Sequence, residues 1–125
     1  MFRLFARLSQ RFRVEIVPGV SSVVACAAAA GLPLAARDET LLVLPATLDE
    51  EALVRRLPLA ETVAIVKLGR HLAKIRRVLT RLGLLDDAVY VERATTPDER
   101  VAPLAEIEAA PYFSLAIVRR RIAVG

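Results

Sequence analysis

Short apolar runs closed by proline or glycine alternate with segments of helical pattern along almost the whole of this 125-residue chain. Alternation at intervals of roughly 20 to 30 residues is typical of an α/β fold. The runs are apolar at nearly every position, as expected for strands covered by helices on both faces. We therefore predict one α/β domain with a largely parallel or mixed five-stranded sheet flanked by helices. The predicted strands are Val14–Val17, Thr40–Leu44, Val63–Leu68, Ala88–Glu92 and Tyr112–Val118.

Capping residues place two helices between the first three strands. Ser21 or Ser22 can cap a helix through its hydroxyl, and Gly31 supplies its end. This helix is mostly alanine, so it is thin, and we expect another element to pack closely against it. A second helix is predicted from the capping box at residues 47–50 (TLDE), with Thr47 as its first capping residue, to Pro58.

The most regular helical pattern runs from Arg70 to Gly83. Its apolar residues recur at spacings of three and four, which gathers them on one face, and basic residues cover the other face. The apolar positions are Leu72, Ile75, Leu79 and Leu82. Residues 93–100 are predicted to form a polar loop, and residues 103–107 a short helix or turn.

The positive charge of the chain is concentrated at its two ends. The formal net charge is +4 and the sequence pI is about 10.0, which would suit a nucleic-acid partner if the charge formed a surface stripe. Seven of the 18 basic residues lie in residues 1–13 and 119–121, and the middle carries 11 basic against 14 acidic residues. No basic run is interleaved with aromatic residues. We therefore predict no nucleic-acid partner.

The single cysteine, Cys26, excludes a disulfide scaffold and fits a reducing, cytoplasmic location. The longest apolar run, residues 23–30, is much shorter than the roughly 20 residues that cross a membrane. Arginines interrupt the apolar residues of the first 13 positions, so these lack the core of a signal peptide. We predict a cytoplasmic protein without a membrane partner.

Small, turn-forming residues follow several of the predicted strands. In α/β sheets, ligands bind beyond the carboxyl ends of the strands, and small residues let the backbone approach a ligand closely. A helix N-terminus after Gly19 would add N–H donors for an anion. Glycine and proline also end strands without any ligand, which is the alternative interpretation of each turn.

Three cations lie at these strand ends, namely Lys67, Arg70 and Arg93. A cation beside a buried strand needs an anion or solvent, because burying an unpaired charge is costly. Three converging cations would suit a ligand with several carboxylates. The alternative is ordinary ion pairing within the chain. The acidic residues available for it are Glu61, Glu92 and Asp98.

The sequence offers no recognisable catalytic acid, base or metal set. His71, the only histidine, has no serine, cysteine or aspartate partner at a recognisable spacing, so we expect no catalytic role for it. Cys26 lies in an apolar segment, where a thiol usually only packs. No CxxC, HxxxH or paired-carboxylate spacing indicates a metal, and we predict none.

Six short blocks carry a family resemblance. They are Val17–Ser22, Gly31–Leu34, Leu42–Thr47, Lys67–Arg70, Glu92–Thr95 and Pro111–Leu115. In this order and spacing they resemble the C-terminal half of the tetrapyrrole methylases, and most of all the branch that methylates precorrin-2 at C20. The resemblance covers nearly everything from Val14 to Val118.

The resemblance implies a methyltransferase of cobalamin biosynthesis that uses S-adenosylmethionine. Its substrate would be a carboxylate-rich reduced tetrapyrrole, precorrin-2 or cobalt-factor II, held in a cleft between two α/β domains. Family members are typically homodimers. By position, the implied cofactor-binding residues are Ser21, Ser22, Leu68, Ala94 and Tyr112, with Phe113 as a further candidate for the cleft wall. The candidate substrate-binding residues are Lys67, Arg70 and Arg93.

One departure from the family pattern is large. Family members begin with another α/β domain whose glycine-rich loops hold the methyl donor, and the residues before Val14 have no room for it. We therefore expect a truncated or split member, inactive alone, whose partner is a missing or separate N-terminal methylase domain. Residues 1–13 would be a remnant of the interdomain helix, residues 14–118 the domain, and residues 119–125 a basic tail. The alternative is a non-catalytic binding or dimerisation module.

Overall fold

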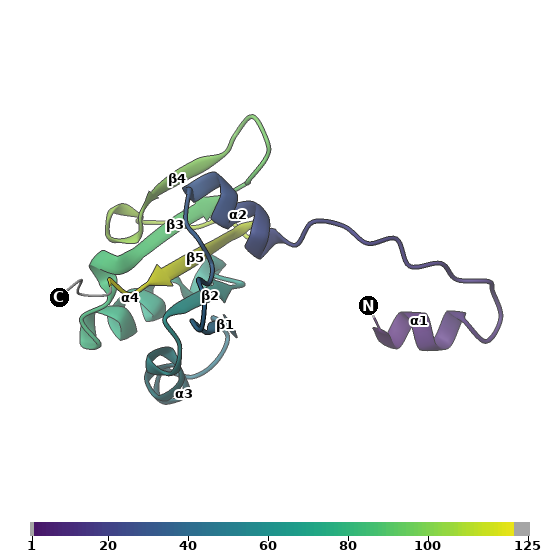
Figure 1. Ribbon diagram of the computed structural model, residues 1–125, viewed down its shortest axis with the longest axis horizontal. Helices are drawn as coiled ribbons and strands as arrows, with labels where there is room; N and C mark the ends of the chain where they lie inside the picture. Colours follow the sequence, from purple (N-terminus) through teal and green to yellow (C-terminus); the bar gives the residue numbers. More distant parts are fainter. Residues whose placement is uncertain (1, 122–125) are drawn as a thin grey trace.

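The structure is a computed structural model that describes residues 2–121, and its central element is a five-stranded sheet (Figure 1). The strands lie in the order β1-β2-β5-β3-β4. Their bounds are β1 Leu41–Pro45, β2 Thr62–Val66, β3 Ala88–Glu92, β4 Arg100–Pro103 and β5 Ser114–Arg119. The helices are α1 Phe2–Leu8, α2 Ser22–Ala30, α3 Glu50–Arg56 and α4 Leu72–Arg81.

The sheet is mixed. β1 and β2 pair in parallel, whereas β5 runs antiparallel to both β2 and β3, and β4 runs antiparallel to β3. The α/β class and the mixed form of the predicted sheet are confirmed, and the largely parallel form is wrong. β1, β2 and β3 still point in the same direction, so their carboxyl ends meet at one edge, beside the amino end of β5.

Four of the predicted strands are present, as β1, β2, β3 and β5. β4 was not predicted, because it is an edge strand with mostly exposed residues and lies partly inside the predicted polar loop. The short helix or turn expected after it is confirmed as a 3₁₀ turn at Leu104–Glu106.

The predicted strand Val14–Val17 is wrong. This segment pairs with no strand of the described residues, and Ile16 and Val17 are 63% and 79% exposed. β-branched residues favour a strand, but a strand also needs a hydrogen-bonding neighbour and a surface that buries its side chains. The segment instead leads away from the sheet to α1, which buries none of its residues (Figure 1).

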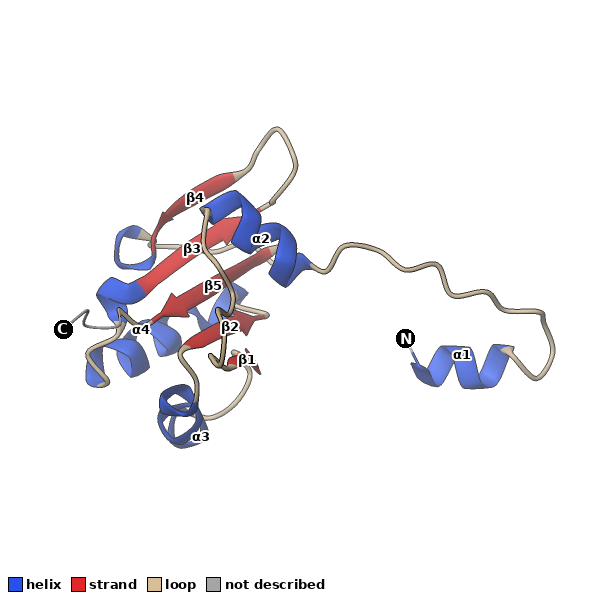
Figure 2. Cartoon of the chain, viewed as in Figure 1, coloured by secondary structure: helices blue, strands red, loops and turns tan. Residues whose placement is uncertain are grey.

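The alanine-rich helix α2 covers one face of the sheet (Figure 2). Ser21 caps it, since its hydroxyl oxygen accepts a hydrogen bond from the backbone N–H of Val23 at 3.2 Å. Gly31 ends it in the left-handed conformation, at φ 64°. Cys26 and Ala27 are buried against β3 and β5, so the expected close packing is confirmed.

Helices α3 and α4 cover the opposite face, where Leu53 and Ile75 are completely buried. The helix predicted after Arg70 is confirmed, although its first turn is a 3₁₀ turn at Gly69–His71. The predicted capping role of Thr47 is wrong. Asp49 caps α3 instead, because its carboxylate accepts from the Ala52 N–H at 2.7 Å and starts the helix two residues later.

A paired substitution tests the close approach of α2. We expect Ala27→Leu to lower the free energy of unfolding by about 1–3 kcal/mol, because a larger side chain cannot fit between α2 and the sheet. Ala28→Leu, on the exposed side of the same helix, should change it by less than about 0.5 kcal/mol. Urea unfolding measures both, and equal effects would contradict the packing described here.

Candidate ligand-binding cleft

A cleft of about 980 Å³ opens at the edge where β2 and β3 end and β5 begins. Its walls come from the start of α2, the residue after β2, the loop after β3 and the residues that lead into β5. These segments are far apart in the sequence. The antiparallel course of β5 between its two neighbours brings them together.

Six of the eight predicted site residues line this cleft. They are Ser21, Ser22, Lys67, Arg93, Ala94 and Tyr112. The two others lie elsewhere. Leu68 is completely buried in the core shared with α3 and α4, so its side chain does not reach the cleft. Arg70 is exposed on the 3₁₀ turn after β2, where the chain has already left the cleft edge.

The start of α2 offers polar groups to this cleft. The Ser21 hydroxyl is engaged as the helix cap, whereas within residues 2–121 the Ser22 hydroxyl has no hydrogen-bond partner. The first backbone N–H groups of a helix lack partners inside the helix and favour an anion or a polar oxygen. This end of the cleft therefore suits a polar part of a ligand.

The opposite wall is a firmly held loop after β3. The Arg93 N–H donates to the Phe113 carbonyl at 3.0 Å, which extends the pairing of β3 with β5. The Arg93 carbonyl accepts from both the N–H and the hydroxyl of Thr96. The Glu99 carboxylate accepts from the Thr95 N–H at 2.6 Å. These bonds fix the backbone around Ala94 before any ligand binds.

Tyr112 and Phe113 form an aromatic pair at the mouth of the cleft. Their ring centroids are 5.1 Å apart in an edge-to-face arrangement, and the two residues are 76% and 74% exposed. Large aromatic groups left this exposed are typical of surfaces that another molecule covers.

The cations at the cleft have no partner within the described part of the chain. Neither Lys67 nor Arg93 makes an ion pair among residues 2–121. The sequence offered Glu61, Glu92 and Asp98 as alternative partners for these cations. Asp98 makes no ion pair among residues 2–121, and the other two carboxylates accept hydrogen bonds from other groups. Glu61 accepts from the Thr40 N–H at 2.7 Å, which lowers the pKa of its carboxyl group. Glu92 accepts from the Tyr90 hydroxyl, and burial together with this contact raises the pKa of Tyr90.

Thr95 and Thr96, in the turn predicted after the fourth strand, also line the cleft, whereas the sequence did not single out Asp98 or Cys26 as cleft residues, although both line it. Burial raises the pKa of the Cys26 thiol, and the charge of Glu99 adds to the shift. The thiol therefore stays protonated and packs.

His71 lies on the 3₁₀ turn outside the cleft. Among residues 2–121, no group of acids, histidine and cysteine could hold a metal ion, and no helix could span a membrane.

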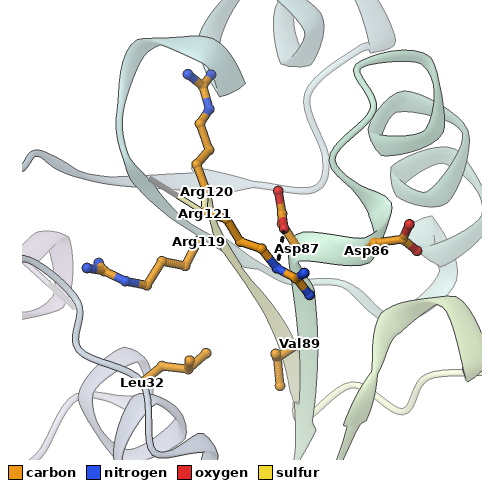
Figure 3. Close-up of a pocket in the computed structure, with 7 residues that line it drawn as sticks. All are labelled: Leu32, Asp86, Asp87, Val89, Arg119, Arg120 and Arg121. Atoms are coloured by element: carbon orange, nitrogen blue, oxygen red, sulfur yellow. Dashed lines mark ion pairs between the residues drawn. The ribbon is translucent and has the colours of Figure 1, made fainter. Parts of the chain in front are cut away.

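A smaller hollow of about 380 Å³ lies at the other end of β5 (Figure 3). Its arginines are already engaged. Arg119 binds the Glu39 carboxylate at 2.9 Å and the Thr62 hydroxyl at 2.8 Å, and Arg121 lies 3.4 Å from Asp87. These contacts hold the end of β5 to Glu39, Thr62 and Asp87. Part of the predicted basic tail, residues 122–125, lies outside the described residues.

The described residues thus form an α/β domain with a mixed sheet and an open cleft at its strand ends. The family model for tetrapyrrole (corrin/porphyrin) methylases matches residues 1–108, and the chain belongs to this family. It is similar to the precorrin-2 C(20)-methyltransferase of Sinorhizobium sp, with 49% identity over 117 residues, which cover 92% of this chain and 48% of that protein.

Two further proteins are similar to this chain. The cobalamin biosynthesis protein CobIJ of Mycobacterium bovis is 50% identical over 123 residues, covering 94% of this chain and 24% of that protein. The crystal structure of a uroporphyrin-III C-methyl transferase from Thermus thermophilus, complexed with S-adenyl homocysteine, superposes with a TM-score of 0.66 at 27% identity. The superposition covers 94% of this chain and 57% of that structure. This chain thus spans about half or less of these relatives.

The two serines at the start of α2 should separate structural from ligand roles. We expect Ser21→Ala to lower the free energy of unfolding by about 1 kcal/mol, because it removes the helix cap. Ser22→Ala should change it by less than about 0.5 kcal/mol, since no described residue bonds to the Ser22 hydroxyl. Urea unfolding measures both, and a larger loss for Ser22→Ala would refute this assignment.

Proposed function

We propose that this chain forms one wall of the active site of a precorrin-2 C20-methyltransferase of cobalamin biosynthesis, and that it is inactive alone. The observation that carries the proposal is the convergence of Ser21, Ser22, Lys67, Arg93 and Ala94 on one open cleft. The family membership and the similarity to methyltransferases of precorrin-2 support it.

The cleft has features that fit S-adenosylmethionine. Backbone N–H groups at the start of α2 and the Ser22 hydroxyl can bind polar groups of the cofactor, and the small side chain of Ala94 lets the fixed loop backbone approach it. Tyr112 offers an exposed aromatic surface beside these groups. We propose Ser21, Ser22, Ala94 and Tyr112 as cofactor contacts. Any contribution of Leu68 comes from its backbone.

The substrate side of the proposal rests on charge. Precorrin-2 and cobalt-factor II carry several carboxylates, and the unpaired cations Lys67 and Arg93 face the same cleft. Hydrogen bonds from such cations to a carboxylate are charge-assisted, and these are stronger than hydrogen bonds between neutral groups. Arg70, which is outside the cleft, would reach only a carboxylate that extends beyond its rim.

The chemistry requires positioning more than proton transfer. When bound, S-adenosylmethionine supplies its methyl group as part of a sulfonium, ready for in-line displacement by a nucleophilic ring carbon. The residues of this chain hold the two molecules in line and exclude water on one side, which accounts for a large part of such a rate enhancement.

We propose that a missing or separately encoded N-terminal methylase domain covers the open side of the cleft. The exposed apolar residues Val17, Val20, Tyr112 and Phe113 lie on or beside it, and surfaces of this kind are normally covered by a partner. A homodimer of the completed protein and a cytoplasmic location belong to the same proposal, together with the division of the chain at residues 13 and 118.

A non-catalytic binding or dimerisation module is the second candidate. The apolar face of α1, with Phe2 at 82% exposure, favours it, because this helix buries nothing within the described chain. The neighbouring reading frame separates the two candidates. An upstream segment that encodes a strand and a glycine-rich loop favours the split enzyme, and its absence favours the module.

Calorimetry tests the half-site directly. For the isolated chain with S-adenosylmethionine we expect binding that is absent or very weak, because only one wall of the site is present. Submicromolar affinity would refute the half-site.

Coexpression with a candidate N-terminal methylase domain tests the activity. We expect the two polypeptides together to transfer a methyl group to precorrin-2, and each alone to transfer none. If the joined halves bind precorrin-2 and S-adenosylmethionine without methyl transfer, the proposed enzyme function is wrong and the binding module stands.

A further inference from the structure

Lys67 interrupts the side-chain alternation of β2. Val63 and Ile65 pack into the core shared with α3 and α4, and Val66 packs on the opposite face with α2. Side chains of a regular strand alternate between the two faces. A strand continued without interruption would therefore place residue 67 in the core with Ile65, where an unpaired ammonium is strongly unfavourable.

The backbone avoids this burial with one left-handed residue. Lys67 has a φ of 59°, its side chain lines the cleft, and Leu68 takes the core position that residue 67 would have filled. The left-handed conformation is unfavourable for residues with a Cβ and costs glycine nothing. Lysine at this position thus accepts local strain that glycine would remove.

Left-handed residues of this kind are concentrated at the cleft. The described residues other than glycine with positive φ are Arg37, Lys67, Arg93 and Thr95, and the last three line the cleft. Arg37 is exposed in the connection between α2 and β1 and lies outside it. Strained backbone that gathers at one cleft indicates a functional reason for keeping it.

We propose that Lys67 anchors a carboxylate of the ligand, and that its left-handed backbone is retained because it delivers the ammonium to the cleft at the expense of stability. This inference rests on the proposed function, which supplies the carboxylate-rich tetrapyrrole. Lys67 thus exchanges stability for binding at a single position. Lys67 has no ion pair among residues 2–121, so its charge remains available to a ligand.

Three variants separate strain from charge. Lys67→Gly removes both, Lys67→Gln removes only the charge, and Arg37→Gly removes the same strain and the same unit of charge away from the cleft. Uroporphyrin III, a stable tetrapyrrole octacarboxylate, is the probe in a fluorescence titration of the full chain. Thermal unfolding without the probe reports stability.

We expect Lys67→Gly and Arg37→Gly each to raise the melting temperature by roughly 2–5 °C, and Lys67→Gln to leave it unraised. Both Lys67 variants should bind uroporphyrin III about threefold to fivefold more weakly, with a difference that shrinks at high salt. Arg37→Gly should bind it as the unaltered chain does, because its lost charge lies outside the cleft.

The outcomes that overturn the inference are distinct from failure of the proposed function. If the unaltered chain binds uroporphyrin III and Lys67→Gln binds it equally well, the anchoring role is wrong and the proposed function stands. If Lys67→Gly is no more stable than the unaltered chain, the retained strain is wrong. If the unaltered chain does not bind uroporphyrin III, the inference is wrong, because it requires the charges of this chain to hold a carboxylate without the second wall. The proposed function then stands, since methyl transfer by the two coexpressed domains tests it separately.

Discussion

β5 lies between β2 and β3 and runs against both, and the position of the candidate cleft depends on this arrangement. Because β2 and β3 point the same way, the residues that follow them leave the sheet at the same edge. The residues that precede β5 enter at that edge, between the other two. Lys67, Arg93 and the aromatic pair Tyr112 and Phe113 are therefore neighbours across the sheet. A fully parallel sheet would have sent the start of β5 to the opposite edge.

The small size of α2 is the second condition for this site. Alanine and cysteine side chains allow the helix to lie close over β3 and β5, so its capped start stands beside the strand ends. A helix of ordinary bulk would be displaced outward. Its sequence thus serves both the packing and the cleft. The bulky residues are concentrated on the other face, under α3 and α4, where Tyr90, Leu53 and Ile75 fill the core without contributing to the cleft.

Local pattern was enough to predict most of the elements and the cleft residues that directly follow strands. Glycine and proline marked the ends of β1 and α2, and apolar spacing marked α4. Strand direction depends on long-range pairing, so the reversal of β5 was not predictable. β4 buries too little to show a pattern. The proposed roles of Leu68 and Arg70 stay predictions. The left-handed turn at Lys67, which the sequence does not reveal, directs the side chain of Leu68 into the core, and Arg70 follows outside the cleft.

Residues 14–17 were predicted as a strand from β-branched residues that, in the structure, have nothing to pair with. We propose that this exposed surface contacts the polypeptide that completes the site. Hydrogen exchange tests it most directly, with the chain measured alone and with a separately produced N-terminal half of the Sinorhizobium relative. We expect rapid exchange at the amides of residues 14–17 in the isolated chain and strong protection in the complex. Protection in the isolated chain, or rapid exchange in a stable complex, would contradict it.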